Sequence, residues 1–282
     1  MIKIIECPRD AMQGIKEFIP TTKKINYINS LLKVGFDTID FGSFVSAKTI
    51  PQMHDTAMVL NGLDLSCTRS KLLAIIANVR GAEDAVEFDE ISYLGFPFSI
   101  SEIFQQRNTN SSIEESLTRV EEIQDLCLRN NKSLVVYLSM AFGNPYQEAW
   151  NAEIAIKWTK KLALLGIKTI ALSDTIGVSN PENIKTLFTS LISSFPKIEF
   201  GAHLHTTADK WEEKIEAAYN SGCRRFDSAI RGFGGCPMAE DKLVGNMPTE
   251  NLLSYFEKQP LNLKTDAFSE SMNIALNTFP IH

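Results

Sequence analysis

Short apolar runs recur along the chain, and each is followed by a longer stretch with helical periodicity. The runs that have the length and composition of buried strands are residues 2–7, 38–41, 71–76, 90–94, 133–139, 169–173, 198–205 and 225–230. Apolar positions three and four apart predict helices over residues 22–34, 113–129, 152–165, 181–194 and 210–221. The pattern therefore indicates an alternation of strands and helices.

Residues that commonly mark helix ends agree with this pattern. Gly35, Gly166 and Gly222 each follow a helical stretch and precede a strand, as expected of glycines that end helices in the left-handed conformation. Ser112 precedes Glu115 by three residues, which is the spacing of a capping box at the start of a helix. These signals place helix ends independently of the apolar periodicity.

Strict alternation of strands and helices implies parallel strands, and eight such units in about 250 residues match an α/β fold of the (β/α)8 TIM-barrel type. An open doubly wound sheet is the structural alternative, but no G-x-G-x-x-G motif follows the first strand. A further helical pattern covers residues 261–277. We therefore expect one domain over residues 1–282, with a barrel over about 1–255 and a short C-terminal helical extension over about 256–282.

The composition is that of an ordinary globular protein, with 44% hydrophobic and 22% charged residues. A formal net charge of −6 argues against nucleic acid or an anionic membrane as a partner. The sequence has no run of about eighteen apolar residues that would span a membrane. It begins without a basic leader or an apolar signal segment, and its five scattered cysteines form no C-x-x-C pair, so we expect a cytoplasmic protein with reduced thiols.

Two of the four histidines in the chain, His203 and His205, stand two residues apart at the end of an apolar run. If residues 198–205 form a strand, both imidazoles leave the same face. Such a pair is either part of a metal site or a pair of hydrogen-bonded histidines near a strand end. The spacing alone leaves both interpretations open.

A TIM barrel places its active site at the C-terminal ends of its strands. The polar residues near those ends are Glu6, Arg9, Asp10, Asp40, Ser43, Asp174, His203 and His205. In a barrel they converge on one mouth, whereas random placement would put some of them on the opposite face. This convergence favours the metal site over the hydrogen-bonded pair.

Six motifs follow one another in an order that is typical of a known family. They are Pro8-Arg9-Asp10-Ala11-Met12-Gln13, Ser43-Phe44-Val45-Ser46-Ala47-Lys48 with Pro51-Gln52-Met53, Ser112-Ile113-Glu114-Glu115-Ser116, Ser173-Asp174-Thr175-Ile176-Gly177, His203-Leu204-His205, and Gly234-Gly235-Cys236-Pro237 with Gly245-Asn246. In these motifs the chain resembles the hydroxymethylglutaryl-CoA lyase family, one of the metal-dependent barrel lyases that are related to Claisen-type synthases. The resemblance runs from residue 1 to about residue 255, and the Gly-Gly-Cys-Pro loop points to the lyase branch.

The resemblance implies that Asp10, His203, His205 and Asn246 bind a divalent metal ion. Two imidazoles and two oxygens suit Mg²⁺ or Mn²⁺ with open positions for substrate oxygens. Taken alone, Asp10 would be interpreted as a helix or turn cap and Asn246 as a turn residue. The implied substrate is an acyl-CoA thioester, and the resemblance also implies a homodimer.

The implied activity is retro-Claisen cleavage of 3-hydroxy-3-methylglutaryl-CoA to acetyl-CoA and acetoacetate. The reaction needs a base for the C3 hydroxyl, and the resemblance implies Asp10 and His203 for this role. It needs positive charge near the thioester oxygen, which Arg9 supplies. It also needs an acid that protonates the enolate carbon. The family uses the cysteine found here as Cys236, on a loop whose glycines permit unusual backbone angles.

A second tier of polar residues is expected to support the site or contact the substrate. Its members are Glu6, Gln13, Asp40, Ser43, Asp174 and Glu250. Asp40 and Asp174 are candidates to orient Arg9 or a ligand histidine, because a metal-bound imidazole usually donates its other N–H to an oxygen.

The chain departs from the family pattern near the expected site. The departures are Ala11 in place of glycine, Asp40 in place of glutamate, Val135 in place of arginine, Thr206 in place of aspartate, and an altered cysteine loop at 240–244. They leave the acyl group open. The alternative functions are a related lyase that acts on another 3-hydroxyacyl-CoA, and a Claisen-type acyltransferase that condenses acetyl-CoA with a 2-oxo acid. A barrel that binds CoA or metal without turnover is the least favoured interpretation.

Overall fold

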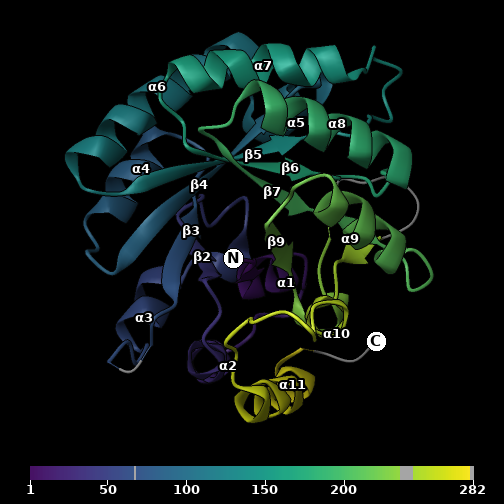
Figure 1. Cartoon of the computed structure of the whole chain (residues 1–282). Helices are drawn as coiled ribbons and strands as arrows, with labels where there is room; N and C mark the ends of the chain where they lie inside the picture. The colour runs from purple at the N-terminus through teal and green to yellow at the C-terminus, as the bar shows by residue number, and fades with distance from the viewer. Residues whose placement is uncertain (67, 236–243, 280–282) are drawn as a thin grey trace.

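The structure is a computed structural model that describes residues 1–66, 68–235 and 244–279. Within this part of the chain, eight parallel strands close into a barrel in the order β1–β2–β3–β4–β5–β6–β7–β9 (Figure 1). The strands are β1 (Lys3–Glu6), β2 (Thr38–Ser43), β3 (Lys71–Ile75), β4 (Ile91–Ser99), β5 (Ser133–Ser139), β6 (Thr169–Ser173), β7 (Glu199–His203) and β9 (Arg225–Ser228). Because β1 pairs with both β2 and β9, the sheet is closed. The predicted TIM barrel is confirmed.

Helices surround the barrel, and the longer ones lie where the apolar periodicity predicts them (Figure 1). Five match the predicted stretches to within one residue at each end: α2 (Thr21–Val34), α6 (Ile113–Arg129), α7 (Ala152–Leu164), α8 (Pro181–Ser194) and α9 (Trp211–Asn220). The short helices escaped prediction: α1 (Pro8–Gln13), α3 (Thr56–Asn61), α4 (Val79–Val86), α5 (Glu102–Thr109) and α10 (Thr249–Tyr255). Helices of six to eight residues complete about two turns, too few to show a clear period.

The last helix, α11 (Thr265–Thr278), lies beside α2 on the outside of the barrel (Figure 1). Edge-on contacts between Tyr27 and Phe279 and between Phe36 and Phe268 hold the two segments together. The sequence pattern predicts this helix at 261–277. Among the helices of the described residues, none is both long enough and apolar enough to cross a membrane.

The prediction of a single strand over 198–205 is wrong at its end. The barrel strand β7 stops at His203, and after Leu204 the chain forms a separate short strand, β8 (His205–Thr206). β8 pairs in antiparallel fashion with β10 (Gly245–Asn246), with Asn246 opposite His205. The chain leaves the barrel here because its backbone groups pair with β10 instead of a barrel strand. This exit brings Asn246 to the histidine pair.

The apolar core has two parts because residues on a strand alternate between faces. The larger part lies between the strands and the surrounding helices, where Ile4, Ile39 and Leu72 are buried. A smaller cluster is formed by Leu73, Ile75, Val135, Tyr137 and Ala171. Its members come from β3, β5 and β6, which are not all neighbours in the sheet, so they meet across the barrel interior. This cluster is the apolar floor beneath the mouth of the barrel.

A buried ion pair fastens α2 to the segment that precedes α3. The Nζ atom of Lys24 lies 2.7 Å from Oδ1 of Asp55, and both side chains are almost completely buried. Lys24 also donates to the carbonyl oxygen of Gln52, whose side chain bonds to the backbone of Ile15 and Glu17. These contacts anchor residues 51–55. The two residues before this segment, Thr49 and Ile50, line a cavity at the mouth of the barrel.

We expect Lys24→Met to destabilise the protein by about 3–5 kcal/mol, because the substitution leaves Asp55 buried without its cation. Urea unfolding followed by circular dichroism would measure this loss. Lys23→Met, at the exposed neighbouring position, serves as the matched control and should change the free energy of unfolding by less than about 0.5 kcal/mol. An equal effect of the two substitutions would contradict the importance of the pair.

Candidate active site

The first helix places two charged residues at the C-terminal end of the barrel. α1 begins with Pro8 directly after β1, and proline is favoured at the first position of a helix. Arg9 and Asp10 follow in its first turn and are each only 6% exposed. Arg9 donates to Oδ2 of Asp40 from Nη2 at 2.5 Å and from Nε at 3.0 Å, and to Oδ1 of Asp10 from Nη1 at 2.9 Å. Gln13 bonds to both Arg9 and Asp10. The guanidinium is therefore fixed on several sides.

Three of the predicted metal ligands come together at this mouth. Ligand atoms of Asp10, His203 and His205 all lie within 4.8 Å of one another. The two imidazole rings are 5.4 Å apart between centroids. Asn246, the fourth predicted ligand, lies next to them and donates from Nδ2 to Oδ2 of Asp10 at 2.7 Å. The structure thus brings together residues from α1, β7, β8 and β10.

The His205 ring is suited to bind a cation. Its Nε2 atom is buried and has no hydrogen-bond partner among the described residues. Burial, and then the nearby charge of His203, lower the pKa of His205 to about 4, so the ring is neutral at physiological pH. A neutral imidazole with a free nitrogen is a common metal ligand. A metal ion would therefore satisfy an atom that the protein leaves unpaired.

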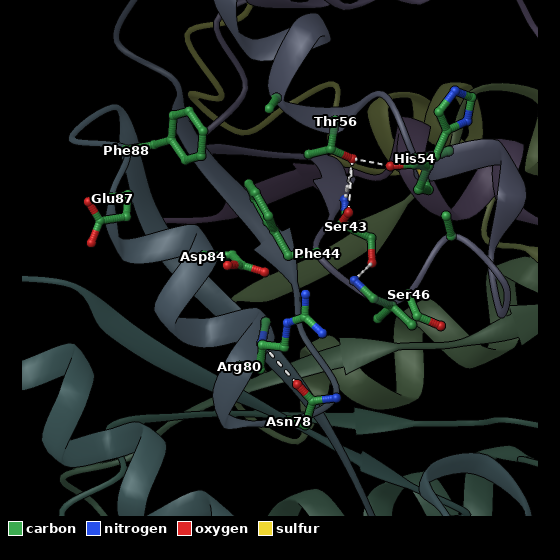
Figure 2. A pocket seen from close by; sticks show the side chains of 15 residues that line it. Ser43, Phe44, Ser46, His54, Thr56, Asn78, Arg80, Asp84, Glu87 and Phe88 are labelled. Atoms are coloured by element: carbon green, nitrogen blue, oxygen red, sulfur yellow. Dashed lines mark hydrogen bonds between the residues drawn. The ribbon is translucent and has the colours of Figure 1, made fainter.

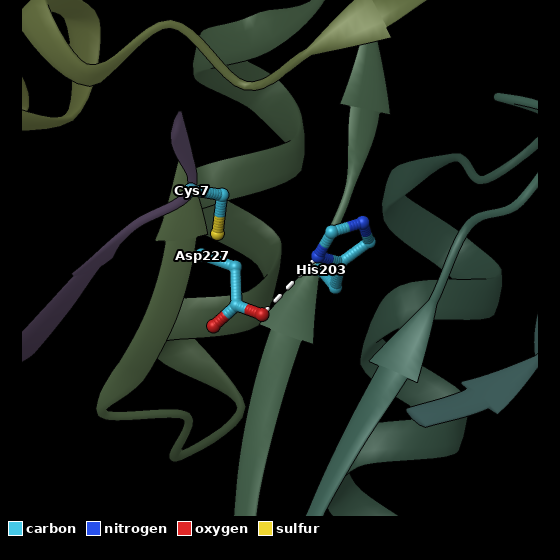
Figure 3. Close-up of side chains that lie close together, drawn as sticks. All are labelled: Cys7, His203 and Asp227. Atoms are coloured by element: carbon cyan, nitrogen blue, oxygen red, sulfur yellow. Dashed lines mark hydrogen bonds and ion pairs between the residues drawn. The ribbon is translucent and has the colours of Figure 1, made fainter. Parts of the chain in front are cut away.

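The His203 ring is held from behind by a residue that the sequence analysis missed. Nδ1 of His203 lies 3.1 Å from Oδ2 of Asp227, which is buried on β9 (Figure 3). Burial lowers the pKa of His203, but the hydrogen bond and the charge of Asp227 outweigh this effect and raise it overall. Because this bond engages Nδ1, Nε2 is the ring nitrogen of His203 that can face a metal ion. An acidic residue near the end of the eighth predicted strand was the signal that would have pointed to Asp227.

A second cluster of potential ligand atoms contains Cys7, His203 and Asp227 (Figure 3). Burial raises the pKa of the Cys7 thiol well above its usual value, and the charges of Asp227 and Asp40 add to this effect. A metal-binding cysteine has to be deprotonated, so this environment disfavours coordination by Cys7. The geometry and charge favour the set with Asp10.

Two hollows adjoin at the mouth. A cavity of about 180 Å³ is lined by residues that include Arg9, Asp10, Tyr137, His203 and His205. A larger groove of about 680 Å³ lies beside it, and Figure 2 shows the residues that line it. Val45 lines both hollows, so they lie on either side of this residue.

Ser43, predicted near the substrate, lines the larger groove (Figure 2). Its hydroxyl donates to the carbonyl oxygen of Ile75, and its backbone N–H donates to Thr56. Gln13, in contrast, lines the smaller cavity beside Arg9. The two second-tier candidates therefore lie on different parts of the mouth.

The two predicted supporting aspartates have different surroundings. Asp40 contacts Arg9, as one of its predicted roles requires, and burial raises the pKa of Asp40 to about 6 against the opposing effect of Arg9. Asp174 accepts from Nζ of Lys214 at 2.9 Å and from the hydroxyl of Ser179. Lys214 also donates to the carbonyl oxygen of His205 at 2.7 Å. Asp174 therefore supports the backbone at His205 through Lys214, which the sequence analysis did not single out.

The two predicted glutamates brace the segments on either side of residues 236–243. Glu6 accepts the backbone N–H of Ile230 at 2.9 Å and the hydroxyl of Thr249 at 2.6 Å. Glu250 accepts the backbone N–H of Arg231 at 3.0 Å. These bonds join residues 230–231 to residues 249–250 and to β1.

Cys236, the predicted acid, lies outside the described residues, but the glycines before it are described. Gly232, Gly234 and Gly235 all have positive φ angles, as the predicted unusual backbone requires. A Cβ atom on Gly234 would lie 2.5 Å from the carbonyl oxygen of Asp10. Only glycine permits this close approach, so the segment before Cys236 passes directly over α1.

The family model described as HMGL-like matches residues 2–275. The chain belongs to the HMGL-like family. It is similar to the cytoplasmic 3-hydroxy-3-methylglutaryl-CoA lyase of Rattus norvegicus, with 34% identity over 268 residues, 94% of this chain and 77% of the relative. It is also similar to a hydroxymethylglutaryl-CoA lyase of Bacillus subtilis, with 32% identity over 268 residues, 94% of this chain and 87% of the relative.

Among solved structures, the chain is similar to an HMG-CoA lyase from Acinetobacter baumannii in complex with coenzyme A and 3-methylmalate. The TM-score is 0.88 at 30% identity, and the match covers 98% of this chain and 90% of that structure. The matched members of the family are carbon–carbon lyases. This chain is accordingly an enzyme of that class.

The buried Glu6 makes stability depend on pH. Burial raises the pKa of Glu6 to about 8, against the opposing effect of its hydrogen bonds. Between about pH 4.5 and pH 8, the folded state keeps a proton that the unfolded state releases, so stability falls as the pH rises through this window. We expect Glu6→Gln, which stays neutral, to gain stability relative to the unmodified protein by up to about 1.4 kcal/mol per pH unit there.

Urea unfolding at pH 5, 6.5 and 8 would measure this difference. The exposed Glu257→Gln variant is the control and should follow the unmodified protein at all three values. A constant offset between Glu6→Gln and the unmodified protein would contradict the assignment.

Proposed function

We propose that the enzyme is a hydroxymethylglutaryl-CoA lyase, which uses a divalent metal ion to cleave 3-hydroxy-3-methylglutaryl-CoA into acetyl-CoA and acetoacetate. The observation that carries the proposal is the convergence of Asp10, His203 and His205 beside Arg9 at one barrel mouth, in a chain of this family. The cavity and the neighbouring groove, which share Val45, support a long thioester substrate with the acyl end in the 180 Å³ cavity.

The proposed metal ligands are Asp10, His203 and His205, with Asn246 as the fourth. The unpaired Nε2 of His205 and the carboxylate of Asp10 fit a divalent cation of the Mg²⁺ or Mn²⁺ type. When bound, the ion supplies positive charge that lowers the pKa of a substrate hydroxyl. The side chains around the ion are proposed to remove the hydroxyl proton, to stabilise the enolate and to protonate it.

Cleavage begins when a base removes the proton of the C3 hydroxyl. The C2–C3 bond then breaks, its electron pair passes to C2, and acetyl-CoA leaves as an enolate while acetoacetate is released. Asp10 and His203 are the two proposed bases. Asp10 combines this role with metal binding more readily, because a carboxylate has two oxygens whereas a metal-bound ring nitrogen has no lone pair left.

Arg9 is proposed to stabilise the negative charge that develops on the thioester oxygen. Its guanidinium is permanently charged and is held by Asp40 and Asp10 before any substrate arrives. A charge that is fixed in advance needs no reorganisation during the reaction.

Cys236 is proposed to donate the proton that converts the C2 enolate of acetyl-CoA to its methyl group. The family resemblance supports this role. So does the position of Gly234, which lies against Asp10 and precedes Cys236 by two residues. The free buried thiols of Cys7, Cys127 and Cys223 support the further proposal of a reducing, cytoplasmic location. The homodimer rests on the family resemblance.

A related lyase activity on another 3-hydroxyacyl-CoA is the second candidate. It is favoured by Val135, which lies in the apolar cluster of the barrel interior where the family pattern has an arginine. Val135 is not among the residues that line the 180 Å³ cavity, but Tyr137 of the same cluster is, so loss of a cation beneath the cavity would change the preference among acyl groups that carry a carboxylate.

The purified protein, incubated with 3-hydroxy-3-methylglutaryl-CoA and Mg²⁺ or Mn²⁺, should release acetoacetate and acetyl-CoA. Cys236→Ala should lower kcat by at least about 100-fold while metal content stays near normal. A folded, metal-loaded protein that yields no acetoacetate would disprove the proposal. Turnover of another 3-hydroxyacyl-CoA would then support the second candidate, and condensation of acetyl-CoA with a 2-oxo acid would support a transferase.

Metal binding has its own test. His205→Gln should weaken Mn²⁺ binding by at least about 100-fold, since a ligand is lost, and electron paramagnetic resonance of free Mn²⁺ measures this directly. His54→Gln, at an exposed histidine outside the cluster, is the matched control and should bind Mn²⁺ as the unmodified protein does. Equal binding by both variants would remove His205 from the metal site.

A further inference from the structure

Cys7, His203 and Asp227 form a cluster beside the proposed metal centre, and the proposed chemistry does not use its thiol (Figure 3). One ligand atom of each residue, with the sulfur of Cys7 among them, lies within 4.8 Å of the other two. Thiolate, imidazole and carboxylate are all ligands of Zn²⁺ in proteins. A cation that prefers sulfur would therefore find three ligands here, in a set that differs from the one with Asp10.

The backbone and a short contact fix the spacing of these ligands. The N–H of Cys7 donates to the carbonyl oxygen of Ser228 at 2.8 Å, which holds the end of β1 beside Asp227 on β9. Nδ1 of His203 and Oδ2 of Asp227 are 3.1 Å apart. Two ligand atoms of one Zn²⁺ ion, with bonds of about 2.0–2.3 Å, lie roughly 3–4 Å apart. The histidine and the aspartate already have this spacing, and Cys7 needs a small shift at most.

Two atoms of the cluster have unused capacity to bind a cation. Oδ1 of Asp227 is buried and has no hydrogen-bond partner among the described residues. The thiol of Cys7 donates a weak hydrogen bond to the carbonyl oxygen of Ile5 at 3.8 Å. A buried carboxylate oxygen without a partner is costly, and a bound cation would remove this cost.

The charge of the set also suits Zn²⁺. A Cys7 thiolate and the Asp227 carboxylate together carry two negative charges, which balance a divalent ion and leave no net charge buried in the set. Burial and nearby carboxylates raise the pKa of Cys7 and keep the free thiol protonated, which disfavours the set for Mg²⁺ or Mn²⁺ because these ions prefer oxygen ligands. Zn²⁺ binds thiolate strongly enough to displace the thiol proton, which passes to solvent.

The mouth of the barrel gives access to the cluster. His203 lines the 180 Å³ cavity and its side chain is 13% exposed, whereas Cys7 and Asp227 are almost fully buried. An ion that enters the cavity therefore meets the ring first and reaches the thiol past it.

We propose that Cys7, His203 and Asp227 form a second cation site, which takes Zn²⁺, and that its occupation inhibits the lyase by withdrawing His203 from the metal centre. The ion replaces the hydrogen bond between Nδ1 and Asp227, and Sγ and Nδ1 each donate a lone pair to it. A neutral imidazole has one N–H, so when Nδ1 binds Zn²⁺ the hydrogen is on Nε2, and Nε2 cannot bind the other ion. The inhibition rests on the proposed function, whereas the Zn²⁺ site does not.

X-ray absorption of protein loaded with equimolar Zn²⁺ in an excess of Mg²⁺ identifies the ligands. We expect one sulfur neighbour at about 2.3 Å from the zinc in the unmodified protein. Cys7→Ser should lose this neighbour. Cys236→Ser should keep it, which excludes the loop cysteine as its source, and Cys223→Ser, at another buried free thiol, is the matched control. No sulfur neighbour in the unmodified protein, or its loss in Cys236→Ser, would overturn the site.

Inhibition is tested by titrating the Mn²⁺-loaded enzyme with Zn²⁺. Cys7→Ser should keep the basal activity but need at least about tenfold more Zn²⁺ for half-inhibition, because loss of a direct ligand costs no less than loss of an outer contact to one. Zn²⁺ should also release Mn²⁺ from the unmodified protein, seen by electron paramagnetic resonance, at concentrations that leave Mn²⁺ bound to Cys7→Ser. Equal sensitivity of the two proteins would show that Zn²⁺ acts at the centre with Asp10 and would overturn the inference.

The outcomes separate this inference from the proposed function. Unmodified protein that shows the sulfur neighbour but releases no acetoacetate would overturn the lyase alone, and release of Mn²⁺ by Zn²⁺ would still test the competition for His203. Protein that releases acetoacetate but shows no sulfur neighbour would overturn the Zn²⁺ site alone. Should Cys7→Ser fail to fold, the zinc spectra of the unmodified protein and of Cys236→Ser decide the question.

Discussion

The candidate site depends on one buried cation, Arg9, paired with two buried carboxylates. Charges are stable inside a protein only when they are paired and hydrogen-bonded, so Arg9, Asp10 and Asp40 constrain one another. β2 supplies Asp40, and the short helix after β1 supplies the other two. Asp10 is held with one oxygen on Arg9 and the other on Asn246, beside the two histidines. The geometry of the proposed metal centre follows from this arrangement.

The two histidines are held by different means, and this difference gives them different electrostatic properties. Asp227 bonds to the ring of His203 and raises its pKa. Lys214 bonds to the backbone carbonyl of His205, whose ring nitrogen Nε2 has no partner among the described residues. A bound cation would give Nε2 of the neutral His205 ring a partner, and the carboxylate of Asp10 lies within reach of the same ion. The pair is therefore better explained as part of a metal site than as a hydrogen-bonded pair of histidines.

The described segments on both sides of residues 236–243 are held close to the same centre. Glu6 bonds to the backbone of Ile230 and to the hydroxyl of Thr249, so the barrel holds the chain on both sides of the loop. Gly234 then passes close to Asp10, where a larger residue would clash. These contacts hold residues 230–235, which directly precede Cys236 in the sequence, beside Asp10.

Apolar periodicity and helix-ending glycines by themselves determined the strand and helix alternation, because both signals are local. The order of the motifs was enough to select Asp10, His203, His205 and Asn246, which the structure brings to one mouth. Only the tertiary structure showed that β7 ends at His203, that the next strand, β8, pairs with β10, and that Asp227 bonds to the ring of His203. These facts depend on which residues face one another once the sheet closes, and spacing along the chain carries no information about partners across a barrel.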